Sequence, residues 1–253
     1  MGVSASEGSF EPQIRVLPDP ESLARHAARS WAQAIRDAIS ARGECVAALP
    51  GGATPGEALE LLAGEGQLDW ARTVVLPGDE RMVPVSDPQS NEGMLRRALV
   101  ERIPGDRPLV LGWGIEPGLG PETVSQRFEA RLLGVVPYVD GRPQLDILAL
   151  GMGADGHTAS LFPGRAYPPE AVVLATQHPD GQRRLSLGPL LLRWARHTHF
   201  LVDGEAKAET LAQVVRGPYD PVRWPAQLVA RNSPHCEIWC DAAAAAQLSE
   251  GAP

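Results

Sequence analysis

The sequence has few cysteines, no long apolar run and no excess of basic residues. Its three cysteines are too few for a disulfide framework in a chain of 253 residues. Acidic side chains outnumber basic ones by 31 to 23, which gives a net charge of -8. Nucleic acids and anionic membranes usually bind surfaces with a basic excess, so the composition argues against both partners. Because no apolar run could cross a bilayer and no signal peptide is recognisable, we expect a cytoplasmic protein.

A metal centre is not expected from the cysteines that are present. Cys236 and Cys240 lie in one short apolar run, and their even spacing puts both on the same face of a strand. Only His235 is adjacent, and a metal site needs more ligands at close spacing. We therefore predict that the cysteines are small buried hydrophobic residues and that the chain binds no metal.

Glycine and proline, by contrast, are abundant, with 26 and 24 residues. They are scattered without a period, which indicates many tight loops and excludes a collagen-like repeat. The hydrophobic fraction of 43% and the charged fraction of 21% are those of an ordinary globular chain. The length fits one large α/β domain or two small ones.

Strand-like and helix-like segments alternate along the chain. A helix is predicted over residues 20–42, because apolar side chains recur there every four positions. Further helices are predicted near residues 55–63, 91–102, 121–133, 205–216 and 241–249. Continuous apolar runs, typical of strands covered on both faces, occupy residues 46–49, 73–76, 145–150, 172–175, 199–202 and 237–240. We predict a polar tail over residues 1–15 and a single α/β domain over 16–250, with a doubly wound, largely parallel sheet and helices on both faces.

The first of three polar loops covers residues 50–57 and leads from a predicted strand into a helix. Gly51 and Gly52 let the backbone approach a ligand closely, and a helix N-terminus offered in this way can bind an anion. Thr54 is predicted to cap the helix, with Glu57 completing a capping box. The same pattern also fits a plain tight turn before a well-capped helix.

The second loop, residues 78–84, places charged side chains directly after another predicted strand. Asp79 could accept hydrogen bonds from sugar hydroxyls, and Arg81 could stabilise an oxyanion or a phosphate. Ser90 and Asn91 lie at the start of the next helix, where they cap it or contact a ligand. A surface ion pair at a strand end is the alternative interpretation.

The third loop, residues 151–164, contains the dinucleotide-binding spacing in Gly151, Gly153 and Gly156. Its context does not fit that motif, because Pro163 interrupts the long helix that should follow and the next predicted strand ends without an acidic residue. We therefore do not predict a nucleotide cofactor.

His157 stands out in this loop because glycine and other small residues surround it. Asp155 could hold one ring nitrogen and leave the other free as a general base. We expect structural or surface roles for the remaining histidines, which are His26, His178, His197, His199 and His235. Two later cations, Arg184 and Lys207, are candidates for anion binding, although solvated charge is the simpler interpretation of each one alone.

Taken in order, these motifs resemble the 6-phosphogluconolactonase family. The matching positions lie roughly within residues 20–245 and are Gly51-Gly52-x-Thr54-Pro55, Asp79-Glu80-Arg81-x-Val83-Pro84, Ser90-Asn91, Gly151-x-Gly153-x-Asp155-Gly156-His157-Thr158-Ala159-Ser160-Leu161-Phe162-Pro163, Arg184-x-Ser186 and Gly204-x-x-Lys207-Ala208. The resemblance implies the modified doubly wound fold shared with glucosamine-6-phosphate deaminase. It also implies a carboxylic ester hydrolase that converts 6-phospho-D-glucono-1,5-lactone to 6-phosphogluconate, in the oxidative pentose phosphate pathway.

Two alternatives stay open beside the lactonase. Deaminases of the same superfamily carry a catalytic Glu five residues after the motif His, where this chain has Phe162, and a Tyr where it has Arg81. A non-catalytic sugar-phosphate sensor would keep the anion loop but lose His157 or Asp155, and both are present. The lactonase is therefore preferred, acting on a phosphorylated sugar lactone without a cofactor, as a monomer or small homo-oligomer.

The lactonase hypothesis gives the candidate residues distinct roles. His157 would act as general base and acid, oriented by Asp155, while Arg81 stabilises the carbonyl oxygen. The residues expected to bind the substrate and its phosphate are Gly51, Gly52, Thr54, Asp79, Asn91, Arg184 and Lys207.

Overall fold

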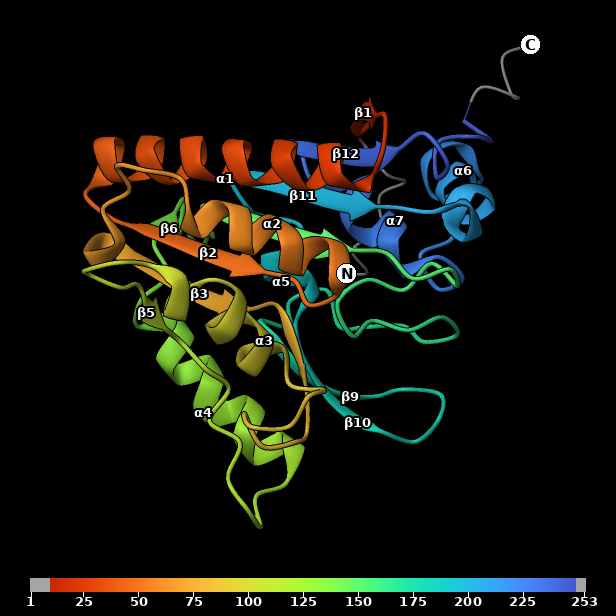
Figure 1. The fold of residues 1–253 in the computed structure, drawn as a ribbon. Helices are drawn as coiled ribbons and strands as arrows, with labels where there is room; N and C mark the ends of the chain where they lie inside the picture. The colour runs from red at the N-terminus through yellow and green to blue at the C-terminus, as the bar shows by residue number, and fades with distance from the viewer. Residues whose placement is uncertain (1–9, 249–253) are drawn as a thin grey trace.

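A computed structural model describes residues 10–248, and its centre is a seven-stranded sheet (Figure 1). All neighbouring strands in this sheet run parallel. In spatial order the strands are β1 (Gln13–Leu17), β12 (Cys236–Asp241), β11 (His197–Val202), β8 (Ile147–Gly151), β2 (Cys45–Leu49), β3 (Thr73–Pro77) and β5 (Leu109–Val110). The predicted largely parallel sheet is confirmed.

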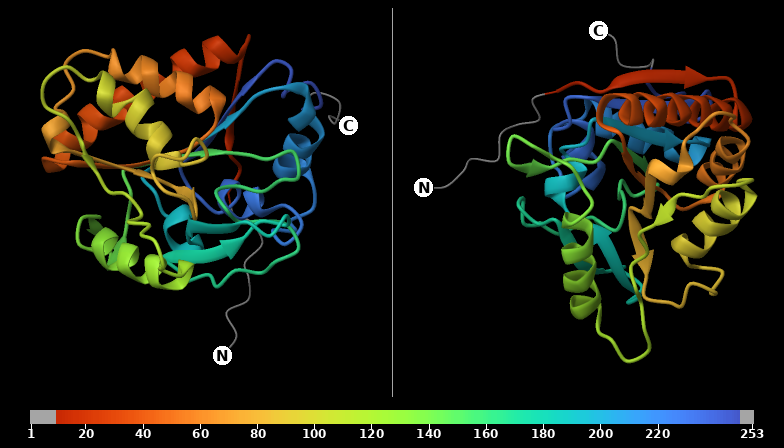
Figure 2. Two further views of the ribbon diagram at one scale, coloured as in Figure 1. Left: turned by 60° about the horizontal axis from the view of Figure 1, so that its bottom comes forward. Right: turned by 90° about the vertical axis from the view of Figure 1, so that its left-hand side faces the viewer.

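Helices cover both faces of the sheet, as the continuous apolar runs predict. The face lined by Ala47 and Ile147 packs on α1, α2 and α3, while the face lined by Ala48 and Leu148 packs on α4, α5, α6 and α7 (Figure 2). All five residues of β2 are buried, as a strand between two helical layers requires. The helices are α1 (Pro20–Arg42), α2 (Ala53–Ala63), α3 (Asn91–Ala98), α4 (Pro121–Leu133), α5 (Pro189–Leu192), α6 (Ala208–Arg216) and α7 (Pro225–Ala230).

A second, three-stranded sheet departs from the sequence prediction. It contains β4 (Asp79–Arg81), β10 (Arg183–Leu187) and β9 (Val173–Gln177), all antiparallel. The apolar run at residues 172–175 was expected in the main sheet. Only residues 178–182 separate β9 from β10, and so short a connection allows a hairpin but no parallel crossover.

Three other segments correct the prediction. Within the predicted helix 241–249, Asp241 ends β12 and residues 242–248 form turns, because the Asp241 carboxylate accepts hydrogen bonds from Ala244 N at 2.7 Å and Gly204 N at 3.1 Å. Residues 205–207 form a 3-10 turn ahead of α6. Residues 13–15 of the predicted tail belong to β1, which pairs with β12, while residues 1–9 lie outside the described part of the chain. The single domain over 16–250 stays a prediction.

An ion-paired carboxylate anchors the amino-terminal end of the sheet. Asp146, which is 1% exposed, accepts a hydrogen bond from Val46 N at 2.9 Å and pairs with Arg42 and Arg196. These contacts join β2, β8, β11 and the end of α1 at the edge opposite the polar loops. Removing one partner of such a buried pair leaves an uncompensated charge and is strongly destabilising.

Buried aromatic and histidine rings pack between α1 and the sheet. His199 stacks on Trp239 with ring centroids 4.0 Å apart, and the centroid of the His26 ring lies 4.7 Å from that of Trp239. His199 is 4% exposed, and its Nδ1 has no hydrogen-bond partner among residues 10–248. Burial, reinforced by His197 and His26, lowers the pKa of His199 to about 3.

No helix within residues 10–248 has the length and apolar character needed to span a bilayer.

We predict that His199 makes the fold acid-sensitive. The unfolded chain takes up a proton on this side chain below its ordinary pKa of 6.5, whereas the folded chain does so only near pH 3, so stability is lost as the pH falls between these values. His199→Phe keeps a stacked ring but takes up no proton. As the pH is lowered from 6 to 4, its free energy of unfolding should therefore fall less steeply than that of wild type, with a difference in slope of about 1.4 kcal/mol per pH unit. Urea unfolding at a series of pH values measures this slope, and an unchanged slope would contradict the prediction.

Candidate active site

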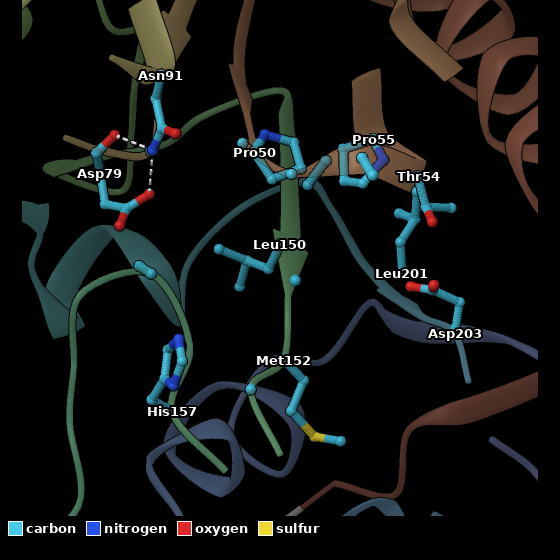
Figure 3. Close-up of a pocket in the computed structure, with 18 of the residues that line it drawn as sticks. Pro50, Thr54, Pro55, Asp79, Asn91, Leu150, Met152, His157, Leu201 and Asp203 are labelled. Atoms are coloured by element: carbon cyan, nitrogen blue, oxygen red, sulfur yellow. Dashed lines mark hydrogen bonds between the residues drawn. The ribbon is translucent and has the colours of Figure 1, made fainter. Parts of the chain in front are cut away.

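The carboxyl ends of the four central strands surround one cavity. It has a volume of about 420 Å³. Its walls come from the segments that follow β2, β3, β8 and β11, and β2 lies beside β8 where the direction of chain winding reverses. Open parallel sheets bind ligands at such a switch point. The polar residues along the cavity include Thr54, Asp79, Arg81, Asn91, His157, Asp203 and Lys207. Figure 3 labels Thr54, Asp79, Asn91, His157 and Asp203 among them.

The start of α2 corrects the predicted capping box. The helix begins at Ala53, its N-cap is Gly52, and no side chain caps it. Gly52 has φ of +111°, a backbone conformation that favours glycine. Thr54 therefore lies inside the first turn and lines the cavity together with Gly51 and Gly52. With no side-chain cap, the backbone N–H groups at the start of this turn belong to Ala53 and Thr54, which both line the cavity.

Asn91 connects the loops that follow β2 and β3. Its Nδ2 donates to the backbone oxygen and to Oδ1 of Asp79, both at 2.9 Å, and its Oδ1 accepts a hydrogen bond from Arg81 Nη1. Arg81 Nη1 also donates to the Gln89 carbonyl at 3.1 Å. A Cβ on Gly51 would collide with Asn91 Oδ1, so only glycine fits there without movement. Asp79, Arg81 and Asn91 are thus brought together.

Asp79 is also tied to the third loop. Its Oδ2 accepts a hydrogen bond from Ser160 Oγ at 2.7 Å, and Ser160 N donates to Ser186 Oγ at 3.2 Å. The Ser160 hydroxyl proton is therefore directed at a carboxylate. This use of the hydroxyl fits a role in joining the loops.

Glu80 is a buried residue that the sequence reasoning did not select. Strand alternation in β4 turns it away from the cavity, between Asp79 and Arg81, and it is 1% exposed. Burial raises the pKa of its carboxyl, while hydrogen bonds from the backbone N–H groups of Glu92, Asn91 and Arg81 act in the opposite direction. The signals in the sequence were its place in the Asp79-Glu80-Arg81 motif and its alternation with two pocket residues.

The Asp155–His157 pair has the geometry that its spacing suggested. His157 Nδ1 lies 2.6 Å from Asp155 Oδ1, and the hydrogen bond to His157 lowers the pKa of Asp155. Because the ionised carboxylate can only accept, Nδ1 is the nitrogen that donates in this contact, and in a neutral imidazole Nε2 is then the acceptor. A Cβ on Gly153 would collide with His157 Nδ1 and lie 2.6 Å from Asp155 Oδ1, so this glycine makes room for the pair.

Lys207 lines the cavity on the side of Asp203. Its Nζ lies 3.4 Å from Asp203 Oδ1. Figure 3 shows Thr54 and Asp203 on one side of Leu150, with Asp79 and Asn91 on the other. Lys207 is also the single lysine of the chain, whose other basic side chains outside histidine are all arginine.

Arg184 does not share the main cavity with Lys207. It lines an adjoining cavity of about 510 Å³, and the two cavities share Gly52, Arg81 and Asn91. Arg184 lies opposite Arg81 across β10 and β4, and two of its buried guanidinium nitrogens, Nε and Nη1, have no partner within residues 10–248. Burial, followed by the proximity of Arg81, lowers the pKa of Arg184. Two facing arginines favour an anion between them.

Fold and cavity together define a parallel α/β protein with a polar ligand site at the switch point of its sheet. The chain belongs to the glucosamine-6-phosphate isomerase/6-phosphogluconolactonase family, whose model matches residues 18–239. The family resemblance drawn from the motifs is confirmed.

Relatives and solved structures agree with this assignment. A 6-phosphogluconolactonase of Synechocystis is 35% identical over 227 residues, covering 86% of this chain and 91% of the relative. The structure of 6-phosphogluconolactonase from Trypanosoma brucei aligns with a TM-score of 0.82 at 25% identity, over 95% of this chain and 100% of that one. A monomeric glucosamine-6-phosphate deaminase has a TM-score of 0.75 at 20% identity, over 93% and 99% of the two chains, which shows a shared fold alone.

We predict that Gly153→Ala separates Asp155 from His157. The added methyl group occupies the space of the imidazole, so Asp155 loses its main hydrogen bond and its pKa returns toward the ordinary value. Carboxyl-carbon NMR titration of the ligand-free protein measures this pKa. Gly151→Ala is the matched control in the same loop, because no atom lies within 4 Å of its added Cβ. Equal Asp155 titration in wild type and Gly153→Ala would contradict the prediction.

Proposed function

We propose that this chain is a 6-phosphogluconolactonase, a carboxylic ester hydrolase that opens 6-phospho-D-glucono-1,5-lactone to 6-phosphogluconate. The observation that carries the proposal is the hydrogen-bonded Asp155–His157 pair at the wall of a cavity that also holds Arg81 and Lys207. A base and a cation near the reacting ester, with further cations for a phosphate, match what the hydrolysis of a phosphorylated lactone needs.

His157 is the proposed general base and acid. With Nδ1–H held by Asp155, Nε2 can take a proton from water as the water oxygen attacks the lactone carbonyl carbon. The carbonyl C–O π bond opens to an oxyanion, which the Arg81 guanidinium stabilises. When the bond between the carbonyl carbon and the ring oxygen breaks, His157 returns the proton to that oxygen. The Arg81 guanidinium makes its hydrogen bonds within residues 10–248 through Nη1 alone, so Nε and Nη2 are available to the substrate.

The phosphate is proposed to lie at the N-terminus of α2. Gly52 lines both cavities, so a phosphate at the first-turn N–H groups lies between Lys207 on one side and Arg184 on the other. The partial positive charge of a helix N-terminus adds to these two full charges. Asp79 and Asn91 then face the sugar hydroxyls from the wall formed by β4 and α3.

A deaminase-like reaction is the second candidate, because the fold is shared with a glucosamine-6-phosphate deaminase. Against it, Phe162 occupies the position of the deaminase Glu and is 2% exposed. Its ring packs 5.4 Å from the His157 ring, and its backbone N–H donates to Tyr167 Oη at 2.7 Å. An apolar wall at this point offers no carboxylate to carry a proton in ring opening.

We predict lactonase turnover without ammonia release. The purified chain is assayed with freshly generated 6-phosphogluconolactone and, in parallel, with glucosamine 6-phosphate. His157→Ala should reduce kcat for the lactone by at least about a hundredfold after subtraction of spontaneous hydrolysis, because it removes the proton carrier. His235→Ala, an exposed histidine, is the matched control.

Ammonia release from glucosamine 6-phosphate would favour the deaminase alternative. Absence of both activities, with binding of 6-phosphogluconate retained, would favour a sensor. A near wild-type rate in His157→Ala would show that another group acts as the base.

Lys207 gives a prediction of a different kind. Lys207→Ala should raise KM about tenfold or more with a smaller change in kcat, because the phosphate is a binding handle remote from the reacting carbon. Pyridoxal phosphate, a phosphorylated aldehyde, should form a reducible adduct at this single lysine that 6-phosphogluconate blocks. Mass spectrometry locates the adduct and distinguishes it from one on the N-terminal amine. An adduct at Lys207 that 6-phosphogluconate leaves unprotected would contradict a phosphate site there.

A further inference from the structure

Glu80 has an environment unlike that of any other carboxylate at the site. It lines neither of the two cavities, yet its side chain receives four hydrogen bonds. Oε1 accepts from Arg81 N at 2.9 Å and Asn91 N at 2.7 Å. Oε2 accepts from Ser90 Oγ at 3.0 Å and Glu92 N at 2.7 Å. Three of these partners, Ser90, Asn91 and Glu92, belong to the start of α3.

These contacts require a carboxylate and not merely a polar side chain. All four partners approach as donors, and an ionised carboxylate offers two oxygens with no proton of its own. A glutamine at position 80 would present an NH₂ group to one pair of these donors. The negative charge also lies at the N-terminus of α3, where the helix dipole favours it.

Through α3, Glu80 reaches the side chains that do face the cavity. It holds the backbone N–H of Asn91. The Asn91 side chain in turn bonds Asp79 and Arg81 and occupies the space that a Cβ on Gly51 would need. It also accepts a hydrogen bond from the backbone N–H of Arg81, its neighbour in β4. The orientation of Arg81, the proposed oxyanion donor, is therefore set by Glu80, which itself lines neither cavity.

We propose that Glu80 is the positioning residue of this site: it holds Asn91 and Arg81 in the geometry that the lactone needs before the lactone binds. The inference rests on the proposed lactonase function. Glu80 touches no substrate atom and exchanges no proton. Its contribution is to keep the Arg81 guanidinium and the Asp79 carboxylate from rearranging when charge develops on the substrate. Catalysis is therefore sensitive to Glu80 although Glu80 does not contact the substrate.

The test compares Glu80→Gln with Asp146→Asn. Asp146 is an equally buried carboxylate that anchors backbone and cations at the opposite edge of the sheet, so both variants lose stability. Well below the melting temperature of either variant, Glu80→Gln should lower kcat for the lactone by at least about tenfold, with a smaller rise in KM. Asp146→Asn should keep kcat and KM within about twofold of wild type. Equal losses in the two variants would overturn the proposal and leave Glu80 as a structural residue.

A second measurement needs neither substrate nor activity. The side-chain amide signal of Asn91 in the ligand-free protein, identified by its loss in Asn91→Ala, should shift in Glu80→Gln and stay in place in Asp146→Asn. An unshifted signal in Glu80→Gln would overturn the proposal. If wild type hydrolyses no lactone, the proposed function fails, and this amide signal still decides whether Glu80 positions Asn91.

A milder variant covers the case in which Glu80→Gln does not fold. Ser90→Ala removes one of the four donors and leaves the carboxylate in place. Because one hydrogen bond to Glu80 is lost, this variant should reduce kcat by about threefold and shift the side-chain amide signal of Asn91. Wild-type kcat together with an unshifted signal would contradict the proposal.

Discussion

The parallel direction of the four central strands is the constraint on which the cavity depends. Parallel strands deliver all their following loops to one edge, so segments that are far apart in the sequence, such as residues 50–57 and 151–164, become neighbours. A parallel sheet in turn needs apolar residues on both faces and helices to cover them. The burial of every residue in β2 and the position of the polar loops are therefore two results of one arrangement.

The proposed phosphate site is compatible with an acidic protein. The net charge of -8 describes the whole surface, whereas the field in a cavity depends on the few charges at its walls and on nearby backbone dipoles. Here Arg81, Arg184 and Lys207 surround the uncapped start of α2. Glu80, although negative, lines neither cavity and has its charge at the start of α3.

Much of the fold could be predicted because the signals were local. The four-residue spacing around Trp31 gave α1, and the Asp155–His157 contact follows from a separation of two residues. The errors arose where tertiary contacts decide. Thr54 has the chemistry of a cap, but the helix begins two residues earlier than predicted because Gly52 can adopt a positive φ. The alanine-rich segment after Asp241 has high helix propensity, yet hydrogen bonds to that carboxylate bend it into turns.

Other features were beyond local reasoning because they depend on long-range packing. Arg184 was expected to hold the phosphate together with Lys207, and the sequence did not show that its strand belongs to the antiparallel sheet, opposite Arg81, so that it lines the adjoining cavity. Glu80 was hidden for a similar reason. Its partners lie ten to twelve residues further along the chain, and nothing in the spacing shows that α3 returns to cover it.

The close approach of Gly51 to Asn91 has a consequence for how sequences of this fold can diverge. A larger residue at position 51 needs the space that the Asn91 carboxamide occupies, while a shorter residue at position 91 would release Asp79 and Arg81. A larger residue at position 51 therefore requires a change at position 91, and that change costs the hydrogen bonds to Asp79 and Arg81. Although they are forty residues apart in the chain, the two positions constrain each other.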